Sequence, residues 1–349
     1  MGEKGLDRDN SIRKWRGVNI IMKKFGIILI GIFLIVIIIY ISTKKTMLAY
    51  IPNADEGTIS VIDTEKDQVI NTIKVDSQLS DGIEASRDGK QIYVGNYSKG
   101  ELFVIDADSG KTLDKIKTGK NLHGIDMTPN GKYLYLASGD FKEGDQYNYI
   151  SIVDTKKQKI IKEIRTNSKS PSHIDFSKDG SLAYVANILS NEISLLDTNK
   201  MEIIATIPVG TVPNEVEPSK DDKYLYVANV TDGTVSVVDI LKQKEIKTIN
   251  VGKGTHGLAL SPDGKFLYAS NRGSNDLIKM NLETYKVTQK VTTGKTANHV
   301  SYVPDTKKLY VTNKDSNDLT VIDDDSFKVI KKVKLGKTPH EISFAKASI

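Results

Sequence analysis

The sequence predicts an all-β protein built as a seven-bladed β-propeller, and three observations lead to this prediction. A tyrosine-bearing motif recurs seven times, at Tyr50, Tyr93, Tyr135, Tyr184, Tyr226, Tyr268 and Tyr310. The successive spacings are 43, 42, 49, 42, 42 and 42 residues, close to the period of about 40 to 45 residues of a propeller blade. Each copy holds four short apolar runs of strand type and almost no helical periodicity.

Each copy has the same order of strands. An opening strand, apolar at alternate positions, ends in a turn such as Ser261–Gly264 and is followed by the tyrosine-bearing strand. The third strand closes with an acidic residue in six copies, at Asp63, Asp106, Asp154, Asp197, Asp239 and Asp323, whereas the sixth copy has Asn281. A carboxylate there accepts hydrogen bonds from the following turn, so we interpret these acids as structural.

Two motifs point to a known family. Tyr310-Val311-Thr312-Asn313 is the YVTN signature, and Ser261-Pro262-Asp263-Gly264-Lys265 is its companion turn. Over residues 47–349 the chain resembles the YVTN-repeat, YncE-like β-propellers. This resemblance implies the fold but no particular activity, because the architecture hosts unrelated functions.

The phase of the repeat predicts how the ring closes. The first copy begins at Met47 with the tyrosine-bearing strand, and the chain ends on an opening-type strand, 339–345. We therefore expect the last strand to join the first three in one blade, a 3+1 closure that removes the free sheet edges of an open arc.

The N-terminal region predicts a membrane anchor. Residues 1–24 form a polar, basic tail, and residues 25–41 are an uninterrupted apolar run that is long enough to span a bilayer core as a transmembrane helix. A short linker, 42–46, then leads to the propeller. The run exceeds the length of a signal-peptide core and lacks a small-residue cleavage site, so an uncleaved signal anchor is preferred to a cleaved signal peptide.

The distribution of charge predicts the orientation of the chain in the cell membrane. Residues 1–46 carry nine Lys or Arg and three Asp or Glu, and most of these cations precede the apolar run. The positive-inside rule then places the N-terminus in the cytoplasm and the propeller on the extracytoplasmic face. The chain total of 49 basic and 44 acidic residues leaves 40 and 41 for the propeller.

A propeller with a net charge near zero has no bulk attraction for nucleic acid. Nucleic-acid binding is therefore the weakest of the candidate roles, although loop residues that suit it are present: Tyr97, Lys99, Phe141, Lys142, Tyr147, Arg272 and Lys314. The chain has no cysteine, which excludes disulfides and thiolate metal sites.

All five histidines fall in two adjoining positions at the start of the opening strand, which should line the central channel. The first position holds Asp81, His123, Ser172, Asn214, His256, Asn298 and His340, and the second holds Gly82, Gly124, His173, Glu215, Gly257, His299 and Glu341. Loops between second and third strands, including an insertion at 139–147, should open on the same face. We predict a ligand site there with Asp81, His123, His173, Asn214, His256, Asn298, His299 and His340.

Two positions further along, four consecutive copies carry an acid, at Glu84, Asp126, Asp175 and Glu217. Carboxylates that crowd a narrow channel should raise the pKa of one another or hold a cation. Histidine and carboxylate together suit a divalent metal, for which His123, His256 and His340 are the predicted ligands. The alternative is structural, with the histidine rings capping backbone groups at the strand entry.

The sequence therefore predicts a monomeric binding or interaction module with an unknown small-molecule or protein ligand at the channel mouth. The competing prediction is a metal-dependent enzyme of lyase or lactone-hydrolase type, in which a channel histidine serves as general acid or base. No other catalytic motif or cofactor is indicated by the sequence.

Overall fold

The computed structural model describes residues 45–75, 78–119, 121–139 and 148–348. The predicted tail, the predicted transmembrane helix over 25–41 and most of the insertion at 139–147 lie outside these residues. Among the described residues, no helix has the length and apolar character needed to cross a membrane. The segment Met47–Ala347 forms one compact unit. The first described strand begins at Lys45, inside the predicted linker.

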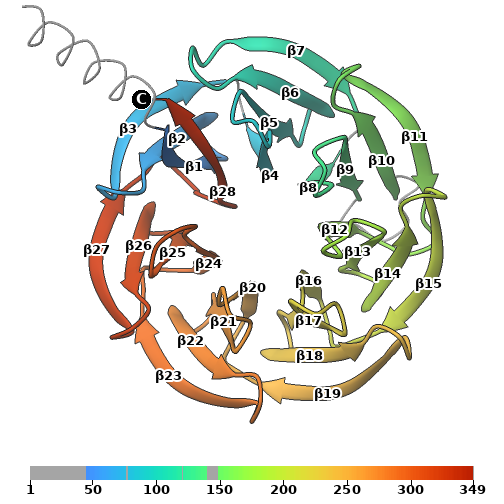
Figure 1. The fold of residues 1–349 in the computed structure, drawn as a ribbon, viewed down its shortest axis with the longest axis vertical. Coiled ribbons are helices and arrows are strands. Elements are labelled where there is room, and N and C mark those ends of the chain that lie inside the picture. Colours follow the sequence, from blue (N-terminus) through green and yellow to red (C-terminus); the bar gives the residue numbers. More distant parts are fainter. Residues whose placement is uncertain (1–44, 76–77, 120, 140–147, 349) are drawn as a thin grey trace, which may run out of the picture. The chain divides into compact units, whose positions relative to one another are not determined.

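The described residues form 28 strands in seven four-stranded antiparallel sheets, arranged as a ring of blades (Figure 1). The prediction of a seven-bladed propeller is thereby confirmed. The inner strands, which surround the channel, are β4 (Leu79–Ala85), β8 (Leu122–Met127), β12 (Pro171–Phe176), β16 (Pro213–Pro218), β20 (Thr255–Leu260), β24 (Ala297–Tyr302) and β28 (Ser343–Ser348).

The tyrosine-bearing second strands are almost entirely buried, and the seven repeated tyrosines are at most 3% exposed. They are β1 (Lys45–Asn53), β5 (Gln91–Asn96), β9 (Tyr133–Ser138), β13 (Leu182–Asn187), β17 (Tyr224–Asn229), β21 (Phe266–Asn271) and β25 (Lys308–Asn313). The third strands are β2 (Thr58–Asp63), β6 (Glu101–Asp106), β10 (Tyr149–Asp154), β14 (Glu192–Asp197), β18 (Thr234–Asp239), β22 (Asp276–Asn281) and β26 (Asp318–Asp323).

The outer strands are largely exposed and form the rim of the ring. They are β3 (Gln68–Lys74), β7 (Thr112–Lys117), β11 (Lys159–Arg165), β15 (Glu202–Pro208), β19 (Lys244–Asn250), β23 (Lys286–Thr292) and β27 (Lys328–Lys334). The core lies between neighbouring blades. Tyr50 and Ile59 of one blade, for example, pack with Val94 and Phe103 of the next. Each blade therefore buries its faces only by stacking on its neighbours.

The first blade confirms the predicted closure. Its strand order is β28-β1-β2-β3, so the last strand of the chain pairs with the first. The predicted strand over 339–345 divides into an isolated bridge between Asn53 and Pro339 and the regular strand from Ser343. The division lies at the same place as the register shifts at the entries of β12, β16, β20 and β24.

The acids that close the third strands are structural, as predicted. Asp63, for example, accepts hydrogen bonds from the backbone N–H groups of Glu65 and Lys66 in the following turn. In the sixth copy Asn281 accepts the corresponding bonds from Glu283 and Thr284. The amide oxygen thus replaces the carboxylate without changing the turn.

Candidate functional site

The entries of the inner strands are β-bulges that turn two neighbouring side chains toward the channel. In β16 the pairing steps from Pro213–Asn229 to Val216–Val227, which leaves Asn214 and Glu215 outside the ladder. The strands β12, β20 and β24 make the same step. Regular alternation would point one residue of each pair away, whereas a bulge re-aims it. Both predicted columns therefore contribute to the channel.

Three of the seven residues in the second column are glycines, and the reason is steric. A Cβ atom on Gly124 would lie 2.2 Å from the backbone oxygen of Ser172 in the next blade. A Cβ atom on Gly257 would lie 2.8 Å from the Cα atom of His299. These positions accept only glycine, so the layer is built by the remaining residues of the column: His173, Glu215, His299 and Glu341.

The first column lines a cavity of about 330 Å³ at the histidine end of the channel, which we call the mouth. Five predicted site residues lie in it: Asp81, His123, Asn214, His256 and His340. Tyr97, Arg272 and Lys314 from the loops between second and third strands line the same cavity. The prediction that these loops and the strand entries share one face is confirmed. Ile188, Val212 and Val230 supply its apolar wall.

Asp81 joins two of the mouth histidines. Its two carboxylate oxygens lie 3.1 Å from Nε2 of His123 and 2.9 Å from Nδ1 of His340. Burial raises the pKa of Asp81, but the imidazoles of His340 and His123 outweigh burial and hold this pKa well below its usual range. Asp81 is therefore a carboxylate at neutral pH.

Below the mouth lies a layer of two histidines and two glutamates. Nδ1 of His173 is 2.6 Å from Oε1 of Glu341, and Nδ1 of His299 is 3.1 Å from Oε2 of Glu215. The Nε2 atoms of both rings are buried without a hydrogen-bond partner. Neither Glu215 nor Glu341 was among the predicted site residues, although both stand in the second column of the sequence alignment.

The two histidines of this layer differ in charge. Burial lowers the pKa of His173, but the carboxylates of Glu215 and Glu341 outweigh burial and raise it to about 9. Burial and the neighbouring His173 hold the pKa of His299 well below its usual range. His173 is thus the cationic partner of the two glutamates, and His299 is neutral.

Arg272 lies in the candidate site, although the sequence indicates only that it is a cation in a loop. Its guanidinium donates hydrogen bonds to Oδ1 of Asn298, 2.7 Å from Nε, and it lies in the mouth. Burial lowers the pKa of Arg272 to about 10. Burial and the Arg272 charge hold the pKa of His256 well below its usual range. Arg272 therefore makes one side of the mouth cationic, and it keeps His256 neutral.

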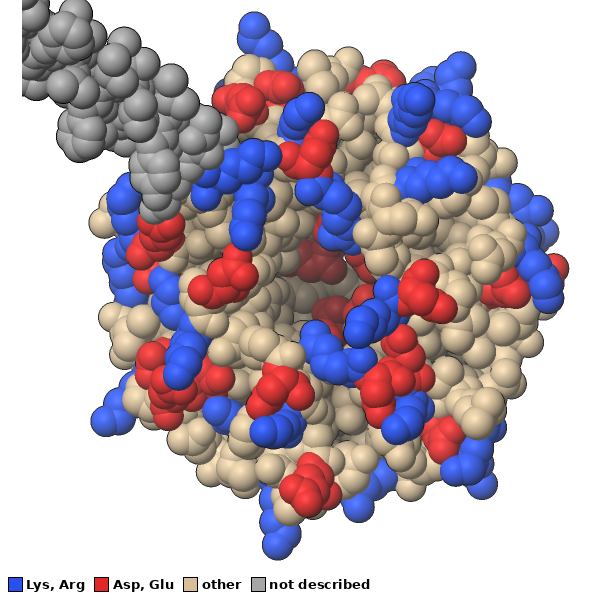
Figure 2. Space-filling model, in the orientation of Figure 1, with Lys and Arg blue, Asp and Glu red and all other residues tan. Residues whose placement is uncertain are grey.

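The four predicted channel acids line a second cavity of about 210 Å³, together with Glu215 and Glu341. Burial raises the pKa values of Glu84 and Asp175 to about 7, and burial with repulsion from Asp175 raises those of Asp126 and Glu217 well above their usual range. Figure 2 shows acidic side chains inside the central hollow and basic side chains around its rim. The pKa shifts have the predicted direction, and burial is their largest cause, ahead of repulsion between the acids.

The histidines that come together differ from those predicted to share a metal. Among the described residues, two groups have ligand atoms within 4.8 Å of one another: Asp81 with His123 and His173, and His173 with Glu215 and His299. His123, His256 and His340 do not form such a group. His173 belongs to both groups, which the strand pattern alone does not reveal.

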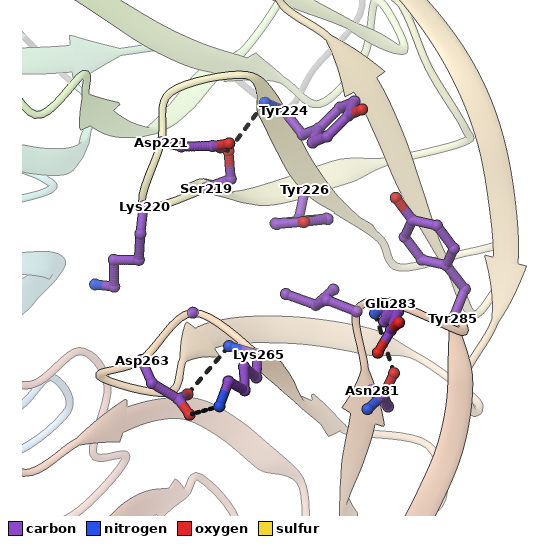
Figure 3. A pocket seen from close by; sticks show the side chains of 12 residues that line it. Ser219, Lys220, Asp221, Tyr224, Tyr226, Asp263, Lys265, Asn281, Glu283 and Tyr285 are labelled. Atoms are coloured by element: carbon purple, nitrogen blue, oxygen red, sulfur yellow. Dashed lines mark hydrogen bonds and ion pairs between the residues drawn. The ribbon is translucent and has the colours of Figure 1, made fainter.

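A further cavity of about 470 Å³ lies outside the channel, between the blade of β16–β19 and the blade of β20–β23 (Figure 3). Tyr224, Tyr226 and Tyr285 lie on one side of it, and Asp263 and Lys265 on another. No sequence motif points to this cavity, since its residues belong to ordinary turns and strands of the repeat.

Most of the propeller matches one known protein family. A model described as YNCE-like beta-propeller matches residues 125–347. The chain belongs to this family. The match covers five of the seven repeated tyrosine motifs, from Tyr135 to Tyr310.

Curated relatives match the chain only in part. An uncharacterized protein of Staphylococcus epidermidis is 25% identical over 148 residues, which are 38% of this chain and 42% of that protein. The uncharacterized protein YncE of Salmonella typhimurium is 28% identical over 164 residues, 46% of this chain and 44% of its own length. Antigen Lp49 of Leptospira interrogans is 31% identical over 145 residues, 39% of this chain and 31% of its own.

Solved structures share the fold. A chain of hydrazine synthase from Kuenenia stuttgartiensis superposes with a TM-score of 0.70 at 21% identity, covering 78% of this chain and 91% of that one. A protein of unknown function from Desulfotomaculum acetoxidans gives a TM-score of 0.73 at 16% identity, covering 85% and 98%. At these identities the similarity establishes the architecture alone.

Proposed function

We propose that the chain is a membrane-anchored binding module whose propeller faces the extracytoplasmic side and takes its ligand at the mouth of the central channel. The observation that carries the proposal is the mouth itself, a concave cavity of about 330 Å³. Ligand pockets combine an apolar wall with a few convergent polar groups. Here Ile188, Val212 and Val230 provide the wall.

The polar groups of the mouth define the ligand chemistry that would fit. Arg272 and Lys314 offer cationic donors, and Asn214 offers an amide. The carboxylate of Asp81 is already in contact with His123 and His340. A ligand with an exposed carboxylate or another acceptor group, on a small molecule or on a loop of a partner protein, satisfies these donors.

A filling substitution tests the mouth. In Val230→Phe a larger apolar side chain occupies the cavity without removing a polar group, whereas Leu241→Phe makes a comparable change at a turn residue that is 92% exposed. Full-length protein and both variants are screened by thermal shift against carboxylic acids, phosphate esters and short acidic peptides. We expect a compound that stabilises the parent and Leu241→Phe but not Val230→Phe. Equal stabilisation of all three chains, or no active compound, would refute the mouth as the ligand site.

The absence of native cysteine provides a test of the membrane topology. Ser11→Cys places one thiol in the basic tail, and Leu241→Cys places one on the propeller. In intact cells, a membrane-impermeant maleimide should label Leu241→Cys and leave Ser11→Cys unlabelled until the membrane is opened. Deletion of residues 25–41 should release the protein from the membrane fraction. The opposite labelling pattern would reverse the proposed orientation.

A further inference from the structure

Three side chains at the base of the mouth bring potential metal-ligand atoms close together. One carboxylate oxygen of Asp81, one ring nitrogen of His123 and one ring nitrogen of His173 all lie within 4.8 Å of one another. Two imidazoles and one carboxylate are a ligand set used by zinc and other divalent transition metals, which leave further positions open for water or another ligand.

The hydrogen bond from Nδ1 of His173 to Glu341 leaves the other ring nitrogen, Nε2, as the one available to a metal ion. Its Nδ1 atom is 2.6 Å from Oε1 of Glu341, so this nitrogen carries the proton donated to the carboxylate. Its Nε2 atom is buried and has no hydrogen-bond partner, and the whole side chain is only 1% exposed. A buried imidazole nitrogen left in this state is costly, and a metal ion that displaces the proton on Nε2 binds this nitrogen and removes the cost.

The outer contacts match those that support metal ligands in proteins. A metal-bound histidine commonly donates its second ring N–H to a carboxylate, which fixes the tautomer and the ring orientation. Glu341 makes this contact with His173, and His340 holds the second carboxylate oxygen of Asp81 at 2.9 Å. The side chains of His173 and Asp81 are therefore already oriented before an ion binds.

The distances agree with coordination after a small adjustment. Tetrahedral ligands of zinc, at about 2.0–2.2 Å from the ion, lie about 3.3 Å from one another. Nε2 of His123 is 3.1 Å from Oδ2 of Asp81, which is already near this value. The His173 ligand atom lies within 4.8 Å of the other two, and ion binding would draw the three together. The mouth cavity, which Asp81 and His123 line, gives the ion a path of entry and leaves its open positions accessible.

We propose that Asp81, His123 and His173 bind one divalent transition-metal ion, of which Zn²⁺ is the best match to the donor set. Glu341 acts as a positioning residue through His173. Binding is measured with the ion alone, so the outcome does not depend on whether the mouth also takes an organic ligand.

The test uses the full-length chain, purified in detergent and freed of metal by dialysis. Zinc is titrated against a chromophoric chelator, and bound metal is counted by elemental analysis. We expect one ion per chain. Asp81→Asn, His123→Gln and His173→Gln should each weaken binding at least tenfold, and Glu341→Gln should weaken it by about 10- to 100-fold. His256→Gln, which changes a buried histidine of the mouth outside the group, should leave affinity within about twofold.

A direct measurement guards against variants that fail to fold. X-ray absorption of the zinc-loaded parent chain should report two imidazole ligands and at least one oxygen. A shell of oxygen alone, no stoichiometric ion, or unchanged affinity in the three folded variants would each overturn the proposal. Loss of zinc in Glu215→Gln and His299→Gln with retention in Asp81→Asn would also overturn it, because the ion would then occupy the lower group.

Discussion

Tyr310 donates its phenolic hydrogen bond to Asp67, which lies 243 residues earlier in the chain and in the neighbouring blade. Nζ of Lys308 is 2.6 Å from the same carboxylate and also 2.6 Å from the backbone oxygen of Thr64. The side chains of Lys308 and Asp67 are only 16% and 12% exposed. These contacts join the last complete blade, β24–β27, to the first.

The first prediction concerns this junction. Lys308→Gln removes a partly buried charge pair and leaves Asp67 without its counter-ion, so we expect the free energy of unfolding to fall by about 2 kcal/mol. Lys66→Gln is the matched control, because the Lys66–Asp63 pair is also short, at 2.8 Å, but its lysine is 63% exposed. Urea denaturation of both variants checks the prediction. A similar loss in both would mean that the junction contributes no more than a surface pair.

The second prediction concerns Lys279, a buried cation in β22. Its Nζ atom is 2.7 Å from Oδ1 of Asp324 and 4.5 Å from the ring centroid of Phe266. Lys279→Met leaves the carboxylate of Asp324 without its cation, so we expect a loss of about 3 kcal/mol.

The double variant Lys279→Met with Asp324→Asn should recover part of this loss, since it removes the uncompensated charge as well. Thermal or urea unfolding of the single and double variants forms a cycle that isolates the coupling between the two residues. Additive losses would show that the pair does not interact in the folded protein.

The third prediction concerns pH and the channel acids. Burial raises the pKa of Glu84 to about 7, above its value in the unfolded chain. The folded state therefore binds more protons than the unfolded state, and the Glu84 contribution to stability is lost as pH rises from about 5 through 7. Glu84→Gln should leave the melting temperature nearly unchanged at pH 5 and raise it relative to the parent at pH 8.

The control for this experiment is Glu163→Gln on the outer strand β11, where the side chain is exposed. It should shift the melting temperature by the same small amount at both pH values. If Glu84→Gln behaves in the same way as Glu163→Gln, then Glu84 is ionised in the folded protein throughout this range.

The fourth prediction concerns the turn after the third strand of the sixth blade. Oδ1 of Asn281 accepts backbone hydrogen bonds from Glu283 and Thr284. Asn281→Asp restores the acid of the other blades and should change stability by less than about 0.5 kcal/mol. Asn281→Leu removes the acceptor and should cost about 1 kcal/mol. Chemical denaturation distinguishes the two. An equal cost for both would assign the effect to side-chain packing.

The fold could be predicted almost completely from the sequence because the repeat is regular. Tyr50 and Tyr310 mark buried second strands, and the phase of the first and last copies determines the closure. The tyrosine signal is local and appears seven times. Its physical basis is the alternation of side chains between the two faces of a strand.

The site could be predicted only in part, because its geometry depends on departures from that alternation. The columns of His123 and His173 are visible in sequence, but the bulges that turn both toward the channel are not. Pairing across the ring is also hidden. The contact between His173 and Glu341 joins residues 168 positions apart, and a single sequence carries no signal for it.

The pairing of β28 with β1 constrains how the protein folds during its synthesis. On the ribosome, the edge of β1 stays unpaired until the residues of β28 have been synthesised, at about 5 to 20 residues per second. Over that interval the nascent chain exposes an unpaired strand edge that can pair with other chains. A chaperone that shields this edge is needed only until β28 pairs with β1 and closes the ring.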